Sequence, residues 1–247
     1  MIARFYVSLC KREINNLLIK KHNYMAMLVF LVGDSGEGKS TSFRNLNPDE
    51  TFIVNSDQKA LPFKSFKTKY NEEKGNYAQT SSYPDVIAAM KAANKNKTIK
   101  TLIVDTFTRI GTDYIMSNNF RTTKGFDKWS HLAGDLYDVI NIVNDKLRED
   151  LIVYLVCHPH TVNDEFGNGY KKIAVQGKQL EKFTLESFSS IVLYTNIKKA
   201  PGKPNEFTFS GENNFNTAKV PMELLENNEI PNDLVILNAK IREYFEI

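Results

Sequence analysis

The amino-acid sequence predicts an α/β fold in which a mostly parallel β-sheet is covered by helices on both faces. Runs of apolar residues at 27–32, 101–105 and 151–157 are typical of strands that are buried on both sides. Segments with helical periodicity lie between these runs, and strands that alternate with helices indicate parallel pairing through crossover connections. A glycine-rich loop directly follows the first apolar run.

The elements of the first half follow in order. A second short strand is expected at 51–54 and an edge strand at 77–79. Ser82 and the proline two residues later mark the start of a helix that continues to Ala93.

The second half continues the alternation. Apolar residues recur at helical spacing from Trp129 to Leu147, which predicts a core-packed helix of about twenty residues. The glycines and Asn168 in segment 166–170 favour a hairpin turn, because Asn-Gly readily adopts positive φ. A further strand is expected at 191–194, and Pro231 is expected to open a final amphipathic helix.

The glycine-rich loop fits the phosphate-binding (P-loop) pattern G-x-x-x-x-G-K-[ST] at every fixed position. A buried strand before it and a short helix at 41–46 after it would aim backbone N–H groups at a phosphate chain. Lys39 would then reach the β- and γ-phosphates, and the Ser40 hydroxyl would bind Mg²⁺. We expect the nucleotide to contact Gly33, Asp34, Ser35, Gly36, Glu37, Gly38, Lys39, Ser40 and Thr41.

Three polar residues at strand ends are candidates for the rest of the chemistry. Asp105 ends the 101–105 run and is expected to bind Mg²⁺ together with Ser40; the alternative is a helix N-cap. Asp57 follows the second strand and would orient or deprotonate the attacking water, if that strand lies next to the first. His158 follows the 151–157 run and would sense the γ-phosphate, although a structural histidine is equally compatible with the sequence.

The composition is that of an ordinary globular protein, with 247 residues, of which 42% are hydrophobic and 25% charged. The net charge of +3 is concentrated at the start, where residues 1–25 carry five Lys or Arg and one Glu, so it does not favour a nucleic-acid partner. Cys10 and Cys157 lie far apart, and Cys157 ends an apolar run, which favours a buried free thiol and a reducing cytoplasm. No apolar run reaches the roughly 18 residues that a membrane-spanning helix needs.

Three segments are predicted along the chain. Residues 1–24 form a basic extension. An amphipathic helix, a transit peptide and upstream sequence outside the natural product are the three interpretations, and a dispensable extension is favoured. Residues 25–200 form the core, and residues 201–247 form a small strand-and-helix addition packed on it.

Further segments carry a family resemblance: residues 52–61, in which Asp57 ends the strand after the P-loop, and residues 151–158, 177–188, 216–219 and 241–244. With the P-loop and Asp105, they resemble the phage-encoded AAA/RecA-like P-loop ATPases of the recombination and single-strand annealing group. The likeness covers residues 26–247. It implies a RecA-like core, ATP and Mg²⁺ as cofactors, ATP hydrolysis, and for Asp57 the role of the RecA catalytic glutamate, although aspartate is one carbon shorter.

The same resemblance implies partners. If the RecA plan holds, the loops 117–124 and 160–172 would face single-stranded DNA, with Arg121, Lys124, Tyr170, Lys171 and Lys172 as contacts. The resemblance also implies a homo-oligomer in which Lys198, Lys199 or Lys219 reaches a neighbour's nucleotide, and a single-strand-binding protein as a partner.

Two other functions remain open from the sequence. A P-loop kinase of a small molecule would need an arginine-rich lid, and after residue 125 the chain has only Arg148 and Arg242. A nucleotide-binding loader or packaging scaffold with little turnover would differ from an ATPase in whether Asp57 faces the γ-phosphate.

Overall fold

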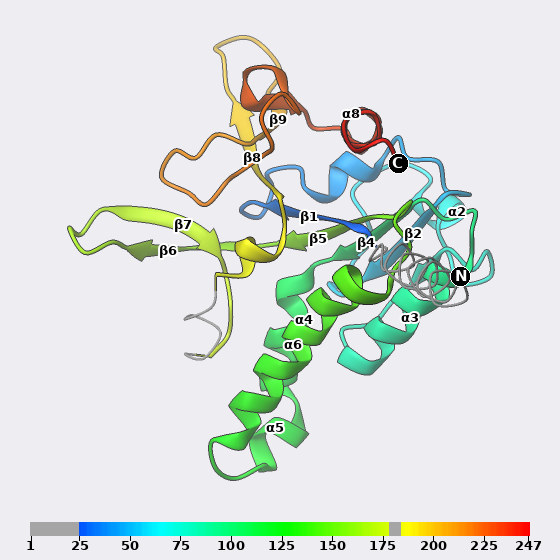
Figure 1. Cartoon of the computed structure of the whole chain (residues 1–247), viewed down its shortest axis with the longest axis vertical. Coiled ribbons are helices and arrows are strands. Elements are labelled where there is room, and N and C mark those ends of the chain that lie inside the picture. Colours follow the sequence, from blue (N-terminus) through cyan, green and yellow to red (C-terminus); the bar gives the residue numbers. More distant parts are fainter. Residues whose placement is uncertain (1–24, 178–183) are drawn as a thin grey trace, which may run out of the picture.

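The computed structural model describes residues 25–177 and 184–247 and has one eight-stranded sheet at its centre (Figure 1). The expected extension 1–24, with Cys10, and segment 178–183 lie outside the described residues. The strands follow the order β10-β9-β8-β1-β5-β4-β2-β3. Their bounds are β1 Met27–Val32, β2 Thr51–Asn55, β3 Tyr77–Ala78, β4 Thr101–Asp105, β5 Ile152–Cys157, β8 Ile191–Lys198, β9 Glu206–Ser210 and β10 Glu229–Pro231.

The sheet is parallel from β3 to β8, whereas β9 pairs antiparallel with both β8 and β10. β1 and β5 run in register from Met27 opposite Ile152 to Val32 opposite Cys157. Because β1, β4 and β5 are apolar and buried on both faces, they form the centre of the sheet. The predicted fold class, a mostly parallel sheet flanked by helices, is confirmed.

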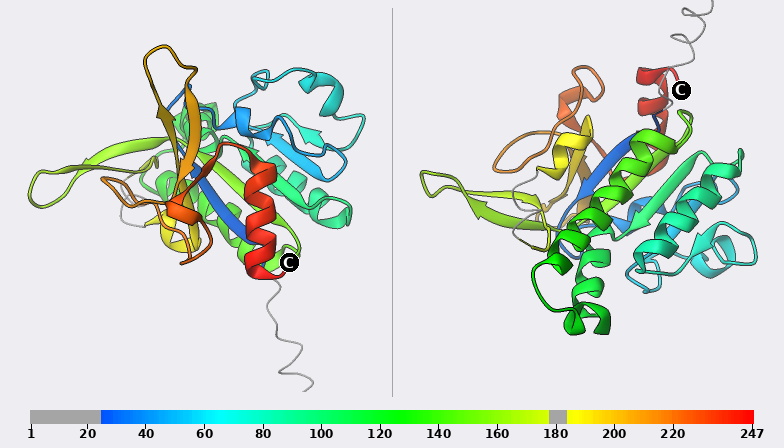
Figure 2. Two further views of the ribbon diagram at one scale, coloured as in Figure 1. Left: turned by 90° about the horizontal axis from the view of Figure 1, so that it is seen from above. Right: turned by 60° about the horizontal axis from the view of Figure 1, so that its bottom comes forward.

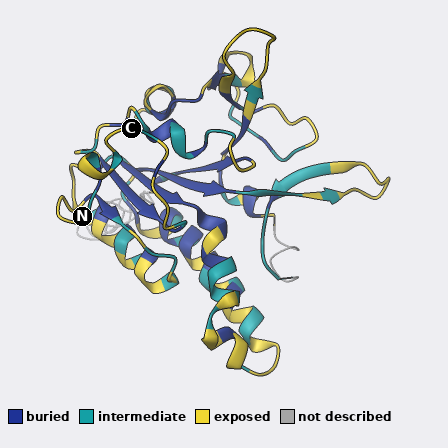
Figure 3. Cartoon of the chain, turned by 180° about the vertical axis from the view of Figure 1, so that it is seen from behind, coloured by how far each residue is buried: buried dark blue, intermediate teal, exposed yellow. Residues whose placement is uncertain are grey.

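Helices cover both faces of the sheet (Figure 2). One face packs against the long α6 and its neighbours through residues such as Leu136 and Val139, and the other packs against Phe43 and the buried side of α8. Figure 3 shows the strands buried between these layers. The helix bounds are α2 Phe66–Lys69, α3 Tyr83–Lys95, α4 Phe107–Met116, α5 Asn118–Thr122, α6 Asp127–Lys146 and α8 Leu234–Phe245.

Three local expectations are corrected. Only a four-residue 3₁₀ helix, η1 Ser40–Phe43, follows the P-loop instead of a helix over 41–46. Pro231 ends β10, and α8 begins three residues later with the Asp233 carboxylate accepting from the Val235 amide, so an N-cap rather than the proline starts this helix. The expected loop 117–124 is mostly α5, because Ser117 caps that helix by accepting from the Phe120 amide.

Other expectations are confirmed. The helix expected from Trp129 onward is the twenty-residue α6, and the edge strand at 77–79 is β3. The hairpin turn at 166–170 joins β6 Pro159–Asn163 to β7 Gly169–Ile173, a two-stranded antiparallel sheet that projects from the end of β5 (Figure 1). Cys157 is a buried free thiol. Within the described ranges, no helix has the length and apolar character to cross a membrane.

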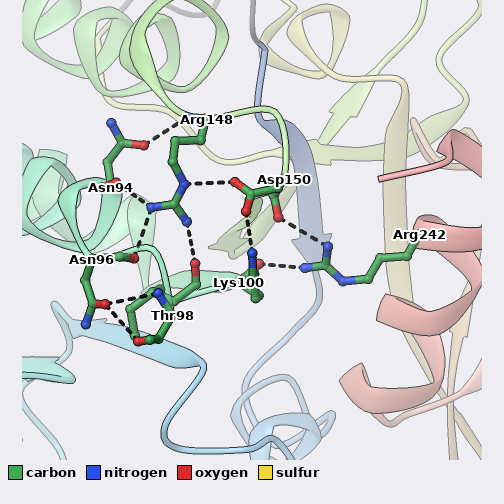
Figure 4. A network of polar contacts seen from close by, with 8 residues as sticks. Asn94, Asn96, Thr98, Lys100, Arg148, Asp150 and Arg242 are labelled. Carbon is green, nitrogen blue, oxygen red and sulfur yellow. Dashed lines mark hydrogen bonds and ion pairs between the residues drawn. The ribbon is translucent and has the colours of Figure 1, made fainter.

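A polar network links the segments that lead into the amino ends of β4 and β5 (Figure 4). The P-loop lies at the other, carboxyl ends of the parallel strands. Arg148 donates to the carbonyls of Asn94 and Ile99 and pairs with Asp150 at 2.8 Å. Arg242 donates from α8 to the carbonyls of Asp150 and Lys100. Both arginines of the second half of the chain therefore hold loops in place, away from the P-loop.

Candidate nucleotide-binding site

The P-loop turns at the carboxyl end of β1 and encloses a cavity of about 410 Å³. Gly36 and Gly38 both have φ of +86°, a conformation that glycine adopts without strain. The cavity is lined by Ser35, Gly36, Gly38, Lys39, Ser40, Thr41, Asn55, Asp57, Lys59, Ala60, Leu61, Pro62, Asp105, Thr106 and His158. The three catalytic candidates and both metal-binding candidates from the sequence therefore share one cavity.

Gly33 lies where no side chain fits. A Cβ atom built there would be 1.7 Å from Oγ1 of Thr195 on β8 and 2.9 Å from Oε2 of Glu37. Thr195 cannot move away freely, because it is buried and donates to Glu37 at 2.8 Å.

We therefore expect Gly33→Ala to lower the free energy of unfolding by about 1–3 kcal/mol through overpacking. Urea denaturation measures this loss. Adding Thr195→Ala removes the closest contact and should recover part of the stability, whereas a loss that the second substitution does not change would contradict the predicted clash.

Lys39 is nearly buried and folds back over the loop. Its Nζ atom donates to the carbonyl oxygens of Gly33 at 2.6 Å and Asp34 at 2.8 Å. Burial lowers the pKa of the Lys39 ammonium, while the carboxylate of Asp105 raises it. The cation is thus held at the cavity wall by groups that a phosphate oxygen would replace as hydrogen-bond acceptors.

Asp105 and Ser40 make the polar pair that the sequence assigned to a metal. The Ser40 hydroxyl donates to Oδ2 of Asp105 at 2.8 Å, across 65 residues of sequence. Burial, against the opposing effect of the Ser40 hydrogen bond and with a smaller contribution from the Asp57 carboxylate, raises the pKa of Asp105 to about 6. A carboxylate and a hydroxyl are ligands that Mg²⁺ accepts, and a cation here would offset the cost of the buried negative charge. The donor set therefore fits the ion.

The raised pKa of Asp105 predicts how the free energy of unfolding depends on pH. Because the folded-state pKa of about 6 lies above the ordinary aspartate pKa of 3.8, the folded protein holds the proton more tightly than the unfolded chain. Protonation of Asp105 therefore stabilises the folded state; this stabilisation is complete below pH 3.8 and is lost as the pH rises through 6. At pH 7 without metal, Asp105→Asn should therefore be more stable than the wild type by roughly 1–3 kcal/mol.

Denaturation in EDTA at pH 4, 5, 6 and 7 tests this prediction. The advantage of Asp105→Asn should grow between pH 4 and 6 and then stay constant. A difference that does not depend on pH would show that the Asp105 charge is not its cause.

Asp57 reaches the cavity by a route that the sequence did not anticipate. The role of Asp57 was predicted on the condition that β2 lies next to β1. This condition is not met, because β5 and β4 lie between the two strands. The backbone amides of Ser56 and Asp57 both donate to the Asp105 carbonyl, which fixes the end of β2 beside that of β4. The Asp57 carboxylate pairs with Nζ of Lys59 at 2.9 Å.

His158 follows β5 directly and lines the same cavity. Its backbone amide donates to the Thr108 hydroxyl at 3.3 Å. Burial, followed by the charge of Lys39, lowers the pKa of the imidazole below its ordinary value of 6.5. At neutral pH His158 is therefore a neutral imidazole that can donate or accept one hydrogen bond.

The two acidic residues of the P-loop connect it to other elements. Asp34 pairs with Lys171 of β7 at 2.5 Å, and Glu37 accepts from the Asp34 amide and from Thr195. From the sequence both residues were expected only as nucleotide contacts. Lys59 was not expected in the site, because its single signal was its position two residues after Asp57.

The remaining sequence candidates are dispersed. Arg121 and Lys124 lie at the tip of the helical arm formed by α4, α5 and the start of α6, whereas Tyr170 and Lys172 lie on the hairpin, which projects in another direction (Figure 1). Lys198 pairs with Glu229 at 2.5 Å, and Lys199 directly follows β8. Lys219 exchanges backbone hydrogen bonds with Val192 of β8.

The sheet, the P-loop and the Ser40–Asp105 pair define the class: a P-loop nucleoside triphosphatase. A model of the AAA domain family matches residues 25–221, and the chain belongs to this family of nucleotide-binding ATPases. Among solved structures, the flagellar accessory protein FlaH from Methanocaldococcus jannaschii is similar, with a TM-score of 0.40 and 9% identity over 75% of this chain and 77% of that chain. None of the curated proteins compared with the chain matches it.

Proposed function

We propose that the protein hydrolyses ATP in a Mg²⁺-dependent reaction at this cavity. The observation that carries the proposal is the convergence of Lys39, the Ser40–Asp105 pair and Asp57 on one cavity of about 410 Å³. These groups supply a phosphate-binding cation, a site for a divalent cation and a carboxylate for water, which are the parts that phosphoryl transfer to water requires.

The roles of the residues follow from their positions. Lys39 and the P-loop amides bind the β- and γ-phosphates. Ser40 and Asp105 would hold Mg²⁺, which when bound would supply positive charge to the phosphate oxygens. Asp57 accepts a hydrogen bond from the attacking water and takes its proton as the water oxygen bonds to the γ-phosphorus; the bond between the γ-phosphorus and the bridging oxygen breaks, and that oxygen leaves with ADP. ADP and inorganic phosphate are the products. The neutral His158 donates a hydrogen bond at the γ-phosphate end.

Phosphate release in wild-type protein tests the proposal directly. We expect turnover with ATP and Mg²⁺ and its loss, to the level of a protein-free control, when EDTA removes the metal. Binding of ATP without measurable phosphate release would instead support the loader or packaging scaffold. Transfer of the phosphate to a small molecule would support a kinase, although Arg148 and Arg242 are engaged far from the cavity and supply no arginine lid.

We further propose that the ATPase acts on single-stranded DNA through the β6–β7 hairpin, in phage recombination or replication. Tyr170 and Lys171 line a cavity of about 480 Å³ next to Glu37 of the P-loop, and Lys171 pairs with Asp34. An aromatic ring beside cations suits stacked bases and a phosphate backbone. The ion pair would connect bound DNA to the nucleotide site.

Fluorescence anisotropy with a labelled single-stranded oligonucleotide over a salt series tests this second proposal. Tyr170→Ala and Lys171→Ala should weaken binding, and the logarithm of the affinity should fall linearly with that of the salt concentration. Arg121→Ala and Lys124→Ala make the matched comparison on the helical arm. A signal that does not respond to salt or to any of these substitutions would exclude DNA as the ligand.

The proposed assembly is a homo-oligomer in which Lys198, Lys199 or Lys219 contacts a neighbour's nucleotide, with a single-strand-binding protein as a partner. The supporting feature is the position of these lysines on β8 or beside it. β8 is the neighbour of β1 on the side away from β5. An ATPase rate per subunit that rises with protein concentration would support the shared site, and a constant rate would argue against it.

A further inference from the structure

A second, smaller cavity adjoins the nucleotide cavity along the P-loop. It has a volume of about 320 Å³ and shares Gly36, Gly38 and Thr41 with the first cavity. A ligand whose phosphates lie in the P-loop can therefore extend into it without leaving the protein surface. Its lining is Gly36, Gly38, Thr41, Arg44, Asn205, Phe207, Pro231 and Asn232.

Phe207 gives this second cavity an aromatic wall. The residue lies on β9, one strand beyond β8, and its side chain remains partly exposed at 36%. Its ring lies against the P-loop, because a Cβ atom built on Gly38 would be 3.0 Å from Cδ1 of Phe207. A phenyl ring that is fixed beside a phosphate-binding loop and partly open to solvent provides a stacking surface for a planar ligand.

Asn232 gives the cavity an unused hydrogen-bond donor. The residue is 4% exposed, and its side-chain Nδ2 has no hydrogen-bond partner among residues 25–177 and 184–247. Its backbone is fixed, since its amide donates to the Phe207 carbonyl at 3.0 Å and its carbonyl accepts from Arg44 at 2.8 Å. A buried amide NH₂ group without an acceptor is costly, so a ligand that supplies an acceptor is favoured here.

We propose that this cavity binds the base of the nucleotide whose phosphates bind at the P-loop. The inference rests on the proposed function. Phe207 stacks on the base, and Nδ2 of Asn232 donates to a ring nitrogen or carbonyl oxygen of the base. A planar heteroaromatic ring with acceptors at its edge meets both requirements, whereas an aliphatic ligand meets neither.

The proposal competes with one other location. The first cavity is also lined by Ala60, Leu61 and Pro62 in the loop after β2, and a base packed there would leave Phe207 without contact. The two locations predict opposite results for substitutions of Phe207, so one comparison separates them.

The experiment compares the affinities of ATP and tripolyphosphate by isothermal titration calorimetry. Tripolyphosphate has the three phosphates without the base or the ribose. We expect Phe207→Leu to weaken ATP about tenfold, within the range of base stacking, and to leave tripolyphosphate unchanged. Phe207→Tyr keeps the ring and should retain the ATP affinity. Asn232→Ala should likewise weaken ATP more than tripolyphosphate.

Controls separate this inference from the proposed function. Phe126→Ala truncates an 86% exposed aromatic residue just before α6 and should change neither affinity. Lys39→Ala should weaken both ligands; if it weakens neither, the P-loop assignment itself fails. An unchanged ATP affinity in folded Phe207→Leu, or an equal loss for both ligands, would overturn the base site while leaving the ATPase proposal intact. Thermal unfolding of each variant shows whether it is folded.

Discussion

Replacing Lys39 with alanine is expected to abolish ATP hydrolysis and to weaken nucleotide binding by at least a hundredfold. Lys39 and Lys59 are the two lysines that line the nucleotide cavity, and Nζ of Lys59 is already paired with Asp57. The ammonium of Lys39 is nearly buried, so its attraction to a phosphate is weakly screened. Alanine removes the charge and leaves the phosphates without a cation from the P-loop.

The measurement is phosphate release together with calorimetric titration of ATP. Lys67→Ala is the matched control, because Lys67 lies exposed on α2 outside the nucleotide cavity and its removal should leave both values unchanged. Lys39 also donates to two loop carbonyls, so the unfolding free energy of Lys39→Ala must be measured as well. A folded Lys39→Ala variant that hydrolyses ATP at the wild-type rate would refute the P-loop assignment.

Features encoded by local pattern could be predicted from the sequence. The apolar runs at β1, β4 and β5 are continuous because these strands are buried on both faces. Continuous apolar runs of this kind are typical of parallel sheets, so the sheet type could be predicted from each run. The fixed spacing of the P-loop identified Lys39 and Ser40. Asp105 was identifiable because a single carboxylate at the end of an apolar strand has a high desolvation cost.

Features that depend on long-range packing could not be predicted. The order of the strands places two of them between β1 and β2, and no local pattern encodes which strands become neighbours. The ion pair between Asp34 and Lys171 joins residues 137 positions apart. Phe207 and Asn232 are an ordinary strand residue and an ordinary loop residue in the sequence, and they become candidates only because β9 folds back along β8 beside Gly38.

The position of Asp57 argues for a catalytic role over that of a turn residue. Its backbone amide donates to the carbonyl of Asp105, so Asp57 is held beside the end of β4, the strand that carries the metal candidate. It lines the same cavity as Lys39 and His158. In the structure it pairs with Lys59, whose side chain is 71% exposed and therefore free to move toward a more strongly charged phosphate. Movement of Lys59 would release the Asp57 carboxylate to accept the proton of water.

Asp57→Asn should therefore keep the affinity for ATP and lower the rate of hydrolysis by about 100-fold to 10,000-fold, the range for loss of a general base. The amide cannot take a proton from water, although it retains nearly the same shape. Single-turnover kinetics at saturating ATP separate this loss from a change in binding.

Asp57→Glu tests the geometry of the site. A rate at or above that of the wild type would show that the shorter side chain of aspartate limits the reaction. A rate as low as that of Asp57→Asn would show that the site is built for aspartate. Equal hydrolysis by Asp57→Asn and the wild type would return Asp57 to the role of a turn residue and require another base at the cavity, for which His158 in the same lining is a candidate.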